Sequence, residues 1–206
     1  MITGNRKPLE ELRQAIGDAQ NILVLGCGTC TTVSQVGGEK QVSELAEALT
    51  LLLAKEGKKA KIATKTILRQ CDPEFFDDVE EDVKKADVLV SLACGAGVQT
   101  AADKYPKLHV TPALNTTSIG ANLPEEDAFR QACSACGRCV LEKTLGLCPI
   151  TRCAKSLLNG PCGGVRDGLC EVDDVPCVWV QIFNKMKDQD RLDEFLTPRL
   201  PEVGRR

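Results

Sequence analysis

The residues whose chemistry stands out in this chain are its twelve cysteines, spread over 206 residues. A thiolate can bind a metal, form a disulfide or act as a nucleophile, so spacing and cellular compartment must decide between these roles. The cysteines fall into two groups, one widely spaced and one dense. The first is Cys27, Cys30, Cys71 and Cys94, and the second is Cys133, Cys136, Cys139, Cys148, Cys153, Cys162, Cys170 and Cys177.

The compartment bears directly on what these thiols do. The segment from Met1 to Glu10 has no apolar core of the kind that secretory signals carry. No stretch reaches the roughly 18 apolar residues that a membrane span needs. We therefore expect a cytoplasmic protein without a membrane span, and in the cytoplasm thiols stay reduced. Metal binding is then the leading explanation for so many cysteines.

Charge and aromatic content narrow the range of partners. The chain has 26 basic and 29 acidic residues, a formal net charge of −3, and no basic stripe or tail. Binding to phosphates requires clustered Lys and Arg, so this balance argues against a nucleic-acid partner. Aromatic residues make up only 3% of the chain, which leaves few platforms for base stacking.

Apolar runs and helical spacings alternate along residues 1–123. This pattern predicts parallel strands joined by helical crossovers. We expect a small doubly wound α/β domain of flavodoxin-like or Rossmann-like type. The expected strands cover residues 21–26, 61–68, 87–92 and 107–114, and the expected helices carry Val42 to Leu53, Pro73 to Val83 and Gly97 to Tyr105.

Three of the first four cysteines fall at the ends of predicted strands. Cys27 ends the first strand, Cys71 follows the second and Cys94 follows the third. Because the carboxyl ends of parallel strands form the ligand crevice of such a sheet, we expect these thiols to converge. Cys30 lies one short turn beyond Cys27. Four converging thiolates match a [4Fe–4S] cluster or a Zn(Cys)4 site.

Other interpretations of these four cysteines remain open. The Cys27-x-x-Cys30 pair is also typical of thioredoxin-like redox thiols. Cys71 or Cys94, taken alone, fits an ordinary buried free cysteine. The Gly-x-Gly turn around Cys27 lacks the third glycine of the dinucleotide fingerprint, so it does not predict nucleotide binding.

Residues 124–206 differ in character from the first part. They have little periodicity before a final amphipathic helix with Trp179, Ile182 and Met186, and we expect an extended tail from Leu196 to Arg206. A segment with so little apolar mass is expected to fold around metal. Cys133-x2-Cys136-x2-Cys139 resembles the start of the bacterial ferredoxin run, and the later Cys-Pro pair, at Cys148, departs from its spacing. Eight thiolates suffice for two clusters, or for one cluster and one Zn(Cys)4 site.

The segment from Cys148 to Gly164, which ends in Asn-Gly-Pro-Cys-Gly-Gly, resembles the methylenetetrahydrofolate reductase C-terminal-type family. The upstream cysteine triple and the downstream segments Gly168–Val172 and Cys177–Trp179 match as well. This resemblance spans about residues 124–186. The half around Gly26–Cys30 is similar to the rest of the MetV-type accessory iron–sulfur subunits, so together nearly the whole chain is covered.

The resemblance implies a role in one-carbon metabolism. MetV-type subunits partner a flavin-containing methylenetetrahydrofolate reductase, which reduces 5,10-methylenetetrahydrofolate to 5-methyltetrahydrofolate in the methyl branch of the Wood–Ljungdahl pathway. The resemblance implies one [4Fe–4S] cluster in the α/β domain and one or two in the cysteine-rich module. Electrons would come from a soluble carrier or a larger redox complex. The alternatives are a zinc-stabilised scaffolding subunit of the same complex and a thiol–disulfide oxidoreductase.

The remaining polar residues do not predict catalysis by this chain alone. His109 is the single histidine and has no paired nucleophile in the sequence. The acidic run from Asp77 to Asp82 fits a solvated helix face better than an acid–base pair. Basic residues among the second group of cysteines either offset cluster charge or keep that surface soluble. They are Arg138, Lys143, Arg152 and Lys155.

Overall fold

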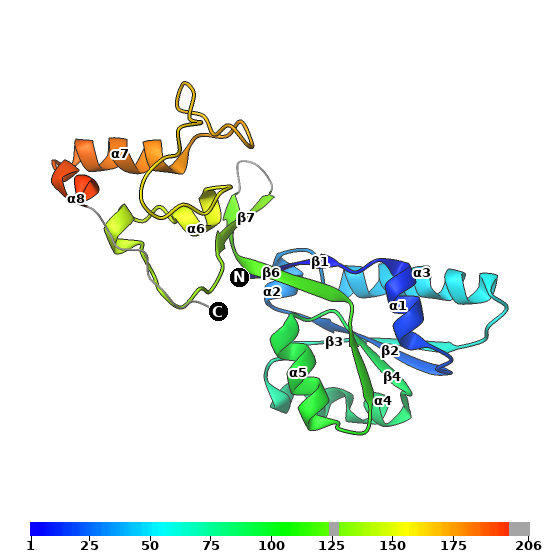
Figure 1. Cartoon of the computed structure of the whole chain (residues 1–206). Coiled ribbons are helices and arrows are strands. Elements are labelled where there is room, and N and C mark those ends of the chain that lie inside the picture. The colour runs from blue at the N-terminus through cyan, green and yellow to red at the C-terminus, as the bar shows by residue number, and fades with distance from the viewer. Residues whose placement is uncertain (124–127, 198–206) are drawn as a thin grey trace. The chain divides into compact units, whose positions relative to one another are not determined.

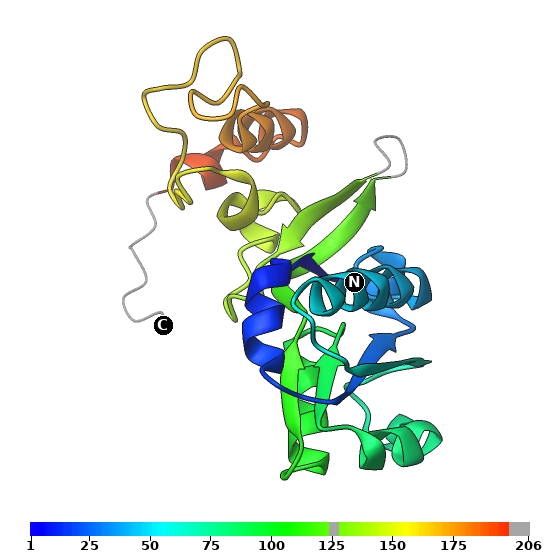
Figure 2. The same cartoon turned by 90° about the vertical axis from the view of Figure 1, so that its right-hand side faces the viewer.

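The computed structural model describes residues 1–123 and 128–197. Its backbone contacts divide the chain into two compact units. The first unit is Met1–Phe129, and the second begins at Arg130. Figures 1 and 2 show that the first unit is built of sheets and covering helices, whereas much of the second is irregular backbone.

The main sheet of the first unit has four parallel strands. They are β2 (Asn21–Cys27), β3 (Lys61–Ile67), β4 (Val88–Ser91) and β5 (His109–Pro112). Their order across the sheet is β3-β2-β4-β5, and every neighbouring pair is parallel. The predicted α/β fold with its four parallel strands is confirmed.

Helical segments connect these strands and cover the sheet. They are α1 (Leu9–Ile16), α2 (Cys30–Val33), α3 (Glu39–Lys55), the 3-10 helix η1 (Pro73–Val79), α4 (Glu80–Lys85) and α5 (Gly95–Lys104). The helix predicted from Pro73 to Val83 is thus split into a 3-10 segment and a short α-helix. Asp72 accepts a hydrogen bond from the amide of Glu74 at 3.4 Å, and Pro73 occupies the first helical turn.

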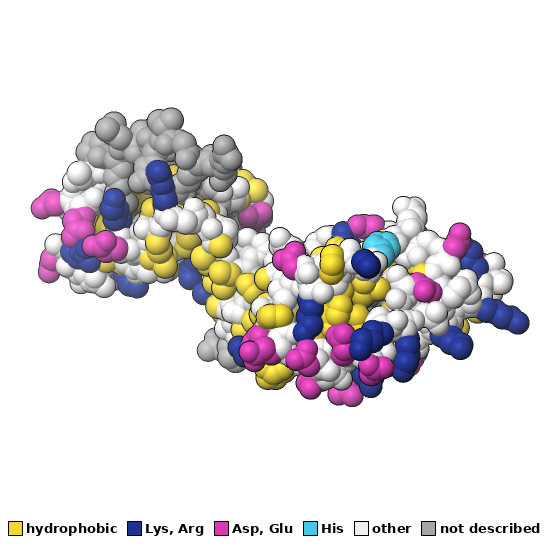
Figure 3. All heavy atoms as spheres, turned by 90° about the horizontal axis from the view of Figure 1, so that it is seen from below, with side chains coloured by type: hydrophobic (Ala, Val, Ile, Leu, Met, Phe, Trp, Pro, Cys, Tyr) yellow, Lys and Arg dark blue, Asp and Glu magenta, His cyan; other side chains and the backbone are white. Residues whose placement is uncertain are grey.

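Charged side chains on the surface of the first unit are interspersed by sign, as Figure 3 shows for one face. Ion pairs form between elements, for example Lys104 with Asp77 at 2.6 Å and Lys65 with Asp82 at 3.5 Å. Exposed pairs of this kind contribute at most about 1 kcal/mol each to stability. The acidic run from Asp77 to Asp82 therefore lies on a solvated helical surface, as predicted.

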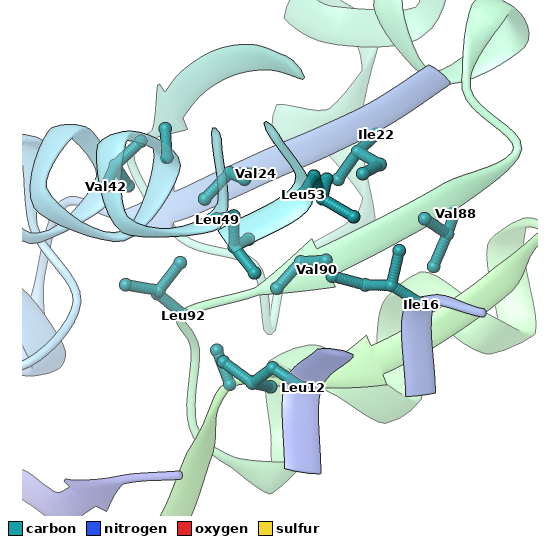
Figure 4. Packing of buried hydrophobic residues seen from close by; sticks show 12 residues of the cluster. Leu12, Ile16, Ile22, Val24, Val42, Leu49, Leu53, Val88, Val90 and Leu92 are labelled. Carbon is teal, nitrogen blue, oxygen red and sulfur yellow. The ribbon is translucent and has the colours of Figure 1, made fainter. Parts of the chain in front are cut away.

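The two faces of the sheet carry separate apolar clusters, because successive strand side chains point to opposite sides. Leu23 and Leu25 of β2 face η1, α4 and α5, where they pack with Phe76 and Val83. Figure 4 shows the other cluster, which lies beneath α1 and α3. Its labelled members are Leu12, Ile16, Ile22, Val24, Val42, Leu49, Leu53, Val88, Val90 and Leu92.

The sequence of α3 accounts for its place in this packing. Its buried apolar residues Val42, Ala46, Leu49 and Leu53 recur at helical spacing and form one stripe. At its start, Gln41 Oε1 accepts a hydrogen bond from the amide of Gly38 at 3.0 Å, which satisfies a free donor of the first turn. The helix thereby crosses from β2 to β3 with one face on the sheet.

A second, three-stranded sheet was not predicted from the sequence. Its strands are β1 (Ile2–Arg6), β6 (Leu114–Leu123) and β7 (Ala128–Cys133), in the order β1-β6-β7. β1 and β6 pair antiparallel. β1 and β6 are rich in Thr, Asn and Gly, and Arg130 and Gln131 interrupt β7, so these strands lack the continuous apolar runs by which the main sheet is recognised.

The second unit has short helices and a small core. The helices are η3 (Glu142–Thr144), α6 (Pro149–Arg152), α7 (Val178–Asp188) and α8 (Leu192–Leu196). The core consists of Cys177 and four residues of α7, including Trp179 and Ile182. The predicted cysteine-rich irregular region with a C-terminal amphipathic helix is confirmed. Most of the predicted tail, residues 198–206, lies outside the described residues.

Candidate metal centre

Three thiols of the first group lie at the carboxyl edge of the main sheet, as the strand pattern predicts. Cys27 is the last residue of β2 and pairs in register with Ile67, the last residue of β3. Cys71 follows β3 by four residues, and Cys94 follows β4 by three and caps the N-terminus of α5. Consecutive parallel strands thus deliver one cysteine each to a common edge.

Two other thiols of this group influence the electrostatics of Cys71. Burial raises the pKa of the Cys71 thiol, and the nearby thiols of Cys27 and Cys94 raise this pKa further. Cys27 is buried, Cys94 is half-buried and Cys71 is exposed. Cys30, at the start of α2, is not among the groups that shift the pKa of Cys71. Three strand ends thus carry one cysteine each, but no three of these side chains lie close enough to hold one ion in the described part of the chain.

Two threonines hold the loop that carries Cys27 and Cys30. Thr31 Oγ1 and Thr32 Oγ1 both donate to the carbonyl of Cys27, at 3.1 and 2.7 Å. The amide of Cys27 donates to the carbonyl of Gly37 at 3.0 Å. The backbone of Cys27 is therefore fixed on both sides, and its buried thiol lies 3.8 Å from Thr29 Oγ1.

A buried glutamine links the three cysteine-bearing segments, and the sequence analysis did not single it out. Gln70 has no exposed surface and hydrogen-bonds Leu25, Gly26 and Ser91. A polar residue just after a strand looks like an ordinary loop residue in the sequence. Its position directly before Cys71 was the one available signal.

In the second unit, the cysteine triple forms an exposed turn at the end of β7. The amide of Ala135 donates to Cys133 Sγ at 3.3 Å, and the Cys136 thiol donates to the carbonyl of Arg138 at 3.5 Å. Ala135 and Gly137 have φ of 50° and 77°, in the left-handed region. A backbone amide directed at sulfur stabilises the thiolate form that binds metals.

Cys148 and Cys153 bracket helix α6, which lies beside the start of the triple. Thr151 Oγ1 donates to the carbonyl of Ala132 at 3.2 Å, one residue before Cys133. Burial and the nearby charge of Arg130 lower the pKa of Arg152, and Cys148 opposes this shift. Cys148 therefore lies in a cationic setting next to the segment that leads into the triple.

A lysine and a glutamate accompany Cys162 and Cys170. Lys155 forms an ion pair with Glu171, and the thiol of Cys162 lies 3.8 Å from Glu171 Oε1. The hydrogen bond to Glu171 raises the pKa of Lys155, and the thiols of Cys162 and Cys170 contribute to this rise. The interaction with Lys155 in turn lowers the pKa of Glu171. The ammonium group of Lys155 therefore interacts electrostatically with both Cys162 and Cys170.

Backbone hydrogen bonds fix the segment between Cys170 and Cys177. The amide of Cys170 donates to the carbonyl of Val175, and the amide of Cys177 donates to the carbonyl of Gly168, both at 2.8 Å. Cys177 is buried and caps α7 at its N-terminus.

The residues present fit thiolate ligation of metal. All twelve cysteines are free thiols, and Cys133 Sγ accepts a hydrogen bond from the amide of Ala135. Within residues 1–123 and 128–197, no group of three or more Cys, His, Asp or Glu side chains lies close enough to hold one ion. The same residues include no helix long and apolar enough to cross a membrane.

Comparison with known families supports the resemblance seen in the cysteine-rich region. Residues 111–202 match the family described as Methylene-tetrahydrofolate reductase C terminal. No curated protein and no solved structure matched the chain. The match begins in β5 and takes in β6, β7 and the described part of the second unit. The chain therefore carries a domain related to methylenetetrahydrofolate reductase. The resemblance of the first half to MetV-type subunits stays a prediction.

Proposed function

We propose that this chain is an iron–sulfur electron-transfer subunit of a methylenetetrahydrofolate reductase. The observation that carries the proposal is the delivery of three free thiols to one edge of a parallel sheet by three neighbouring strands. The family match of residues 111–202 supports the link to the reductase. The flavin-containing catalytic subunit is the proposed partner, and a soluble carrier or a larger redox complex is the proposed donor.

In the first unit, Cys27, Cys30, Cys71 and Cys94 are the proposed ligands of a [4Fe–4S] cluster. Such a cluster accepts and releases one electron at a time. The residues of the chain hold it and set its surroundings: the threonines fix the Cys27 loop, and α5 directs its N-terminal amides toward Cys94. The exposed side chain of Cys71 leaves this edge accessible to a redox partner.

For the second unit, we propose two sets of four ligands. Cys148 belongs with the triple Cys133, Cys136 and Cys139, because α6 is hydrogen-bonded to the residue before the triple. We group Cys162 with Cys170 because both interact electrostatically with Lys155. We add Cys177 because backbone hydrogen bonds join residues 168–170 to residues 175–177. Cys153 completes this second set, since it packs against the core that contains Cys177.

Backbone strain in the second unit is a further reason to expect metal there. Among the described non-glycine residues of the second unit, left-handed φ angles occur at Asp190 and at five residues that each lie within three positions of a cysteine: Ala135, Leu145, Ser156, Asp167 and Asp174. Such conformations cost about 1 kcal/mol or more each outside glycine, and they persist only where surrounding structure imposes them. A small apolar core does little to impose them, whereas ligation of eight thiolates would.

Metal analysis of the full chain tests the proposal. After anaerobic purification, we expect iron and acid-labile sulfide in equal amounts, about four of each per cluster and two or three clusters per chain. Reduction with dithionite should produce an electron paramagnetic resonance signal of reduced clusters. Stoichiometric zinc without iron would overturn the redox role and leave a scaffolding subunit.

Two further measurements test the thiol–disulfide alternative and the association with a reductase. If Cys27 and Cys30 form a thiol–disulfide pair instead, replacing both with Ser will leave the metal content unchanged. Under the cluster proposal, the same change removes iron from the first unit. For the partner, we expect co-purification with a flavin-containing reductase under anaerobic conditions, and failure to associate would contradict the proposed complex.

A further inference from the structure

Gln70 lies fully buried between the strands that carry the thiols of the first unit. Its Nε2 donates to the carbonyls of Leu25 at 2.8 Å and Gly26 at 3.0 Å. These are the two residues directly before Cys27, and Gln70 itself directly precedes Cys71. One side chain therefore connects the backbone that leads into Cys27 with the backbone that leads into Cys71.

The other end of the same amide reaches the third cysteine. Ser91 Oγ donates to Gln70 Oε1 at 2.7 Å, and the amide of Ala93 donates to Ser91 Oγ at 3.2 Å. Ala93 directly precedes Cys94. Gln70 and Ser91 together thus join three segments, each of which ends one residue before a candidate ligand.

Hydrogen bonding and packing leave the Gln70 amide one orientation. Both N–H donors of Nε2 are used by carbonyls, so a flipped amide would place two acceptors against each other. The first turn of α5 also packs closely here, because a Cβ atom on Gly97 would lie 2.8 Å from Gln70 Cβ and 2.7 Å from Ala93 Cβ. Helix α5, which follows Cys94, therefore packs directly against Gln70 and Ala93.

We propose that Gln70 is a positioning residue that sets the separations between the thiols of Cys27, Cys71 and Cys94. The inference deepens the proposed function, because it concerns the residues that hold the cluster site ready before metal binds. All three hydrogen-bond partners of the Gln70 side chain lie within three residues of a candidate ligand, on strands that lead to Cys27 and Cys94. A fully satisfied buried network fixes its members in one arrangement. Loss of the Gln70 amide removes three buried hydrogen bonds, while the Leu25 carbonyl keeps its bond from the Leu92 amide and Ser91 Oγ keeps its bond from the Ala93 amide.

The separation of the thiols can be measured in the metal-free full chain. Equilibration with reduced and oxidised glutathione, followed by peptide mapping of the disulfides, gives the effective molarity of each cysteine pair. Gln70→Met keeps the approximate volume and removes every hydrogen bond. We expect it to lower the effective molarity of the Cys27–Cys71 and Cys71–Cys94 pairs about tenfold, the effect of losing one or two buried hydrogen bonds.

Ser91→Ala provides a selective second variant that retains the core packing. It removes the connection between Gln70 and Ala93 but leaves both bonds from Gln70 to the β2 carbonyls. We expect the pairs that involve Cys94 to weaken, while the Cys27–Cys71 pair stays within about twofold of the unmodified chain. If Gln70→Met does not fold, the selective effect of Ser91→Ala tests the proposal by itself. A Ser91→Ala chain in which the effective molarity falls equally for all three cysteine pairs, or for none of them, would refute the proposal.

Leu53→Ala is the matched control for general loss of stability. Leu53 is buried near the C-terminal end of α3 and contacts none of the linked segments through a hydrogen bond. If this variant lowers the melting temperature as much as Gln70→Met and also lowers the effective molarities as much, Gln70 has only a structural role. A chain that binds no iron would contradict the proposed function but leave the thiol measurements valid, so the two failures are distinguishable.

Discussion

The carboxylate of Glu171 fills the space into which a side chain on Gly164 would project. This carboxylate is also the ion-pair partner of Lys155 and lies 3.8 Å from the thiol of Cys162. Gly163, by contrast, has nothing within 4 Å of the position that a Cβ atom would take. Two adjacent glycines of the same segment therefore have different roles, and one of them makes room for a charged group beside two candidate ligands.

Replacing Gly164 with Ala should displace Glu171, and Lys155 with it, from Cys162 and Cys170. We expect the variant to retain less iron in the second unit after anaerobic gel filtration, with a loss of about one cluster equivalent. Gly163→Ala is the matched control and should retain the full iron content. Equal iron in both variants would show that the position of Glu171 does not affect ligation.

The charge of Lys155 should control the reactivity of the neighbouring thiols. A cation beside a thiol favours the thiolate and lowers its pKa. Lys155→Gln removes that cation and leaves Glu171 unopposed, so Cys162 and Cys170 should both be alkylated more slowly at neutral pH in the metal-free chain. Lys187→Gln, which alters an exposed lysine of α7, should leave both rates unchanged. Alkylation rates at each cysteine are measured by peptide mass spectrometry.

The raised pKa of Cys71 predicts a specific dependence of stability on pH. Burial, Cys27 and Cys94 all favour the neutral thiol in the folded protein. A group whose pKa is higher in the folded state stabilises the fold at low pH, and this contribution is lost as pH rises above the unfolded value of about 8.5. Because Cys71 is exposed, solvent screens the effect, and we expect less than about 1 kcal/mol.

Urea unfolding of the metal-free chain at neutral and alkaline pH measures this dependence. The unmodified chain should lose more stability than Cys71→Ser between about pH 7.5 and pH 10, since the variant lacks the titrating thiol. Identical losses would mean that the other thiols do not influence Cys71.

Much of the first unit could be predicted from the sequence, because its central strands β2 and β4 are buried on both faces. The runs in β2 and β4 are continuously apolar, and the thiol positions follow from where those runs end. β1 and β6 could not be recognised in this way, since Thr3, Asn115 and Thr116 interrupt any apolar pattern. Their pairing joins residues that are far apart in the sequence, from Arg6 with Leu114 to Ile2 with Ile119.

The candidate site was predicted through its ligands but not through its supporting residues. Cysteine is rare enough for its spacing to carry information, whereas Gln70 and Ser91 are common residue types with no sequence signature. Their importance comes from burial and from partners that are 21 to 45 residues away. Glu171 was likewise visible only as part of a family-like segment, because its contact with Gly164 depends on how the loop folds.

Metal removal should affect the two units differently, and the chain has one reporter for each. Trp179, the single tryptophan, lies in the core of the second unit, where its Nε1 donates to the carbonyl of Leu157 at 3.1 Å. Tyr105, the single tyrosine, packs edge-on against Phe76 in the first unit at a centroid distance of 5.8 Å and donates to Glu80 at 2.6 Å. The first unit has two apolar clusters, whereas the second has one small core.

Chelation of metal should therefore unfold the second unit while the first unit stays folded. We expect the emission of Trp179 to shift to the red as its core opens to water, because the thiolate bonds that organise the second unit are lost. The near-ultraviolet circular dichroism of Tyr105 should persist until a separate transition at higher temperature. Trp179→Phe provides the control spectrum for the tyrosine signal. If the emission of Trp179 does not move after metal removal, the second unit folds without metal, and its strained turns near the cysteines must be held by the apolar core alone.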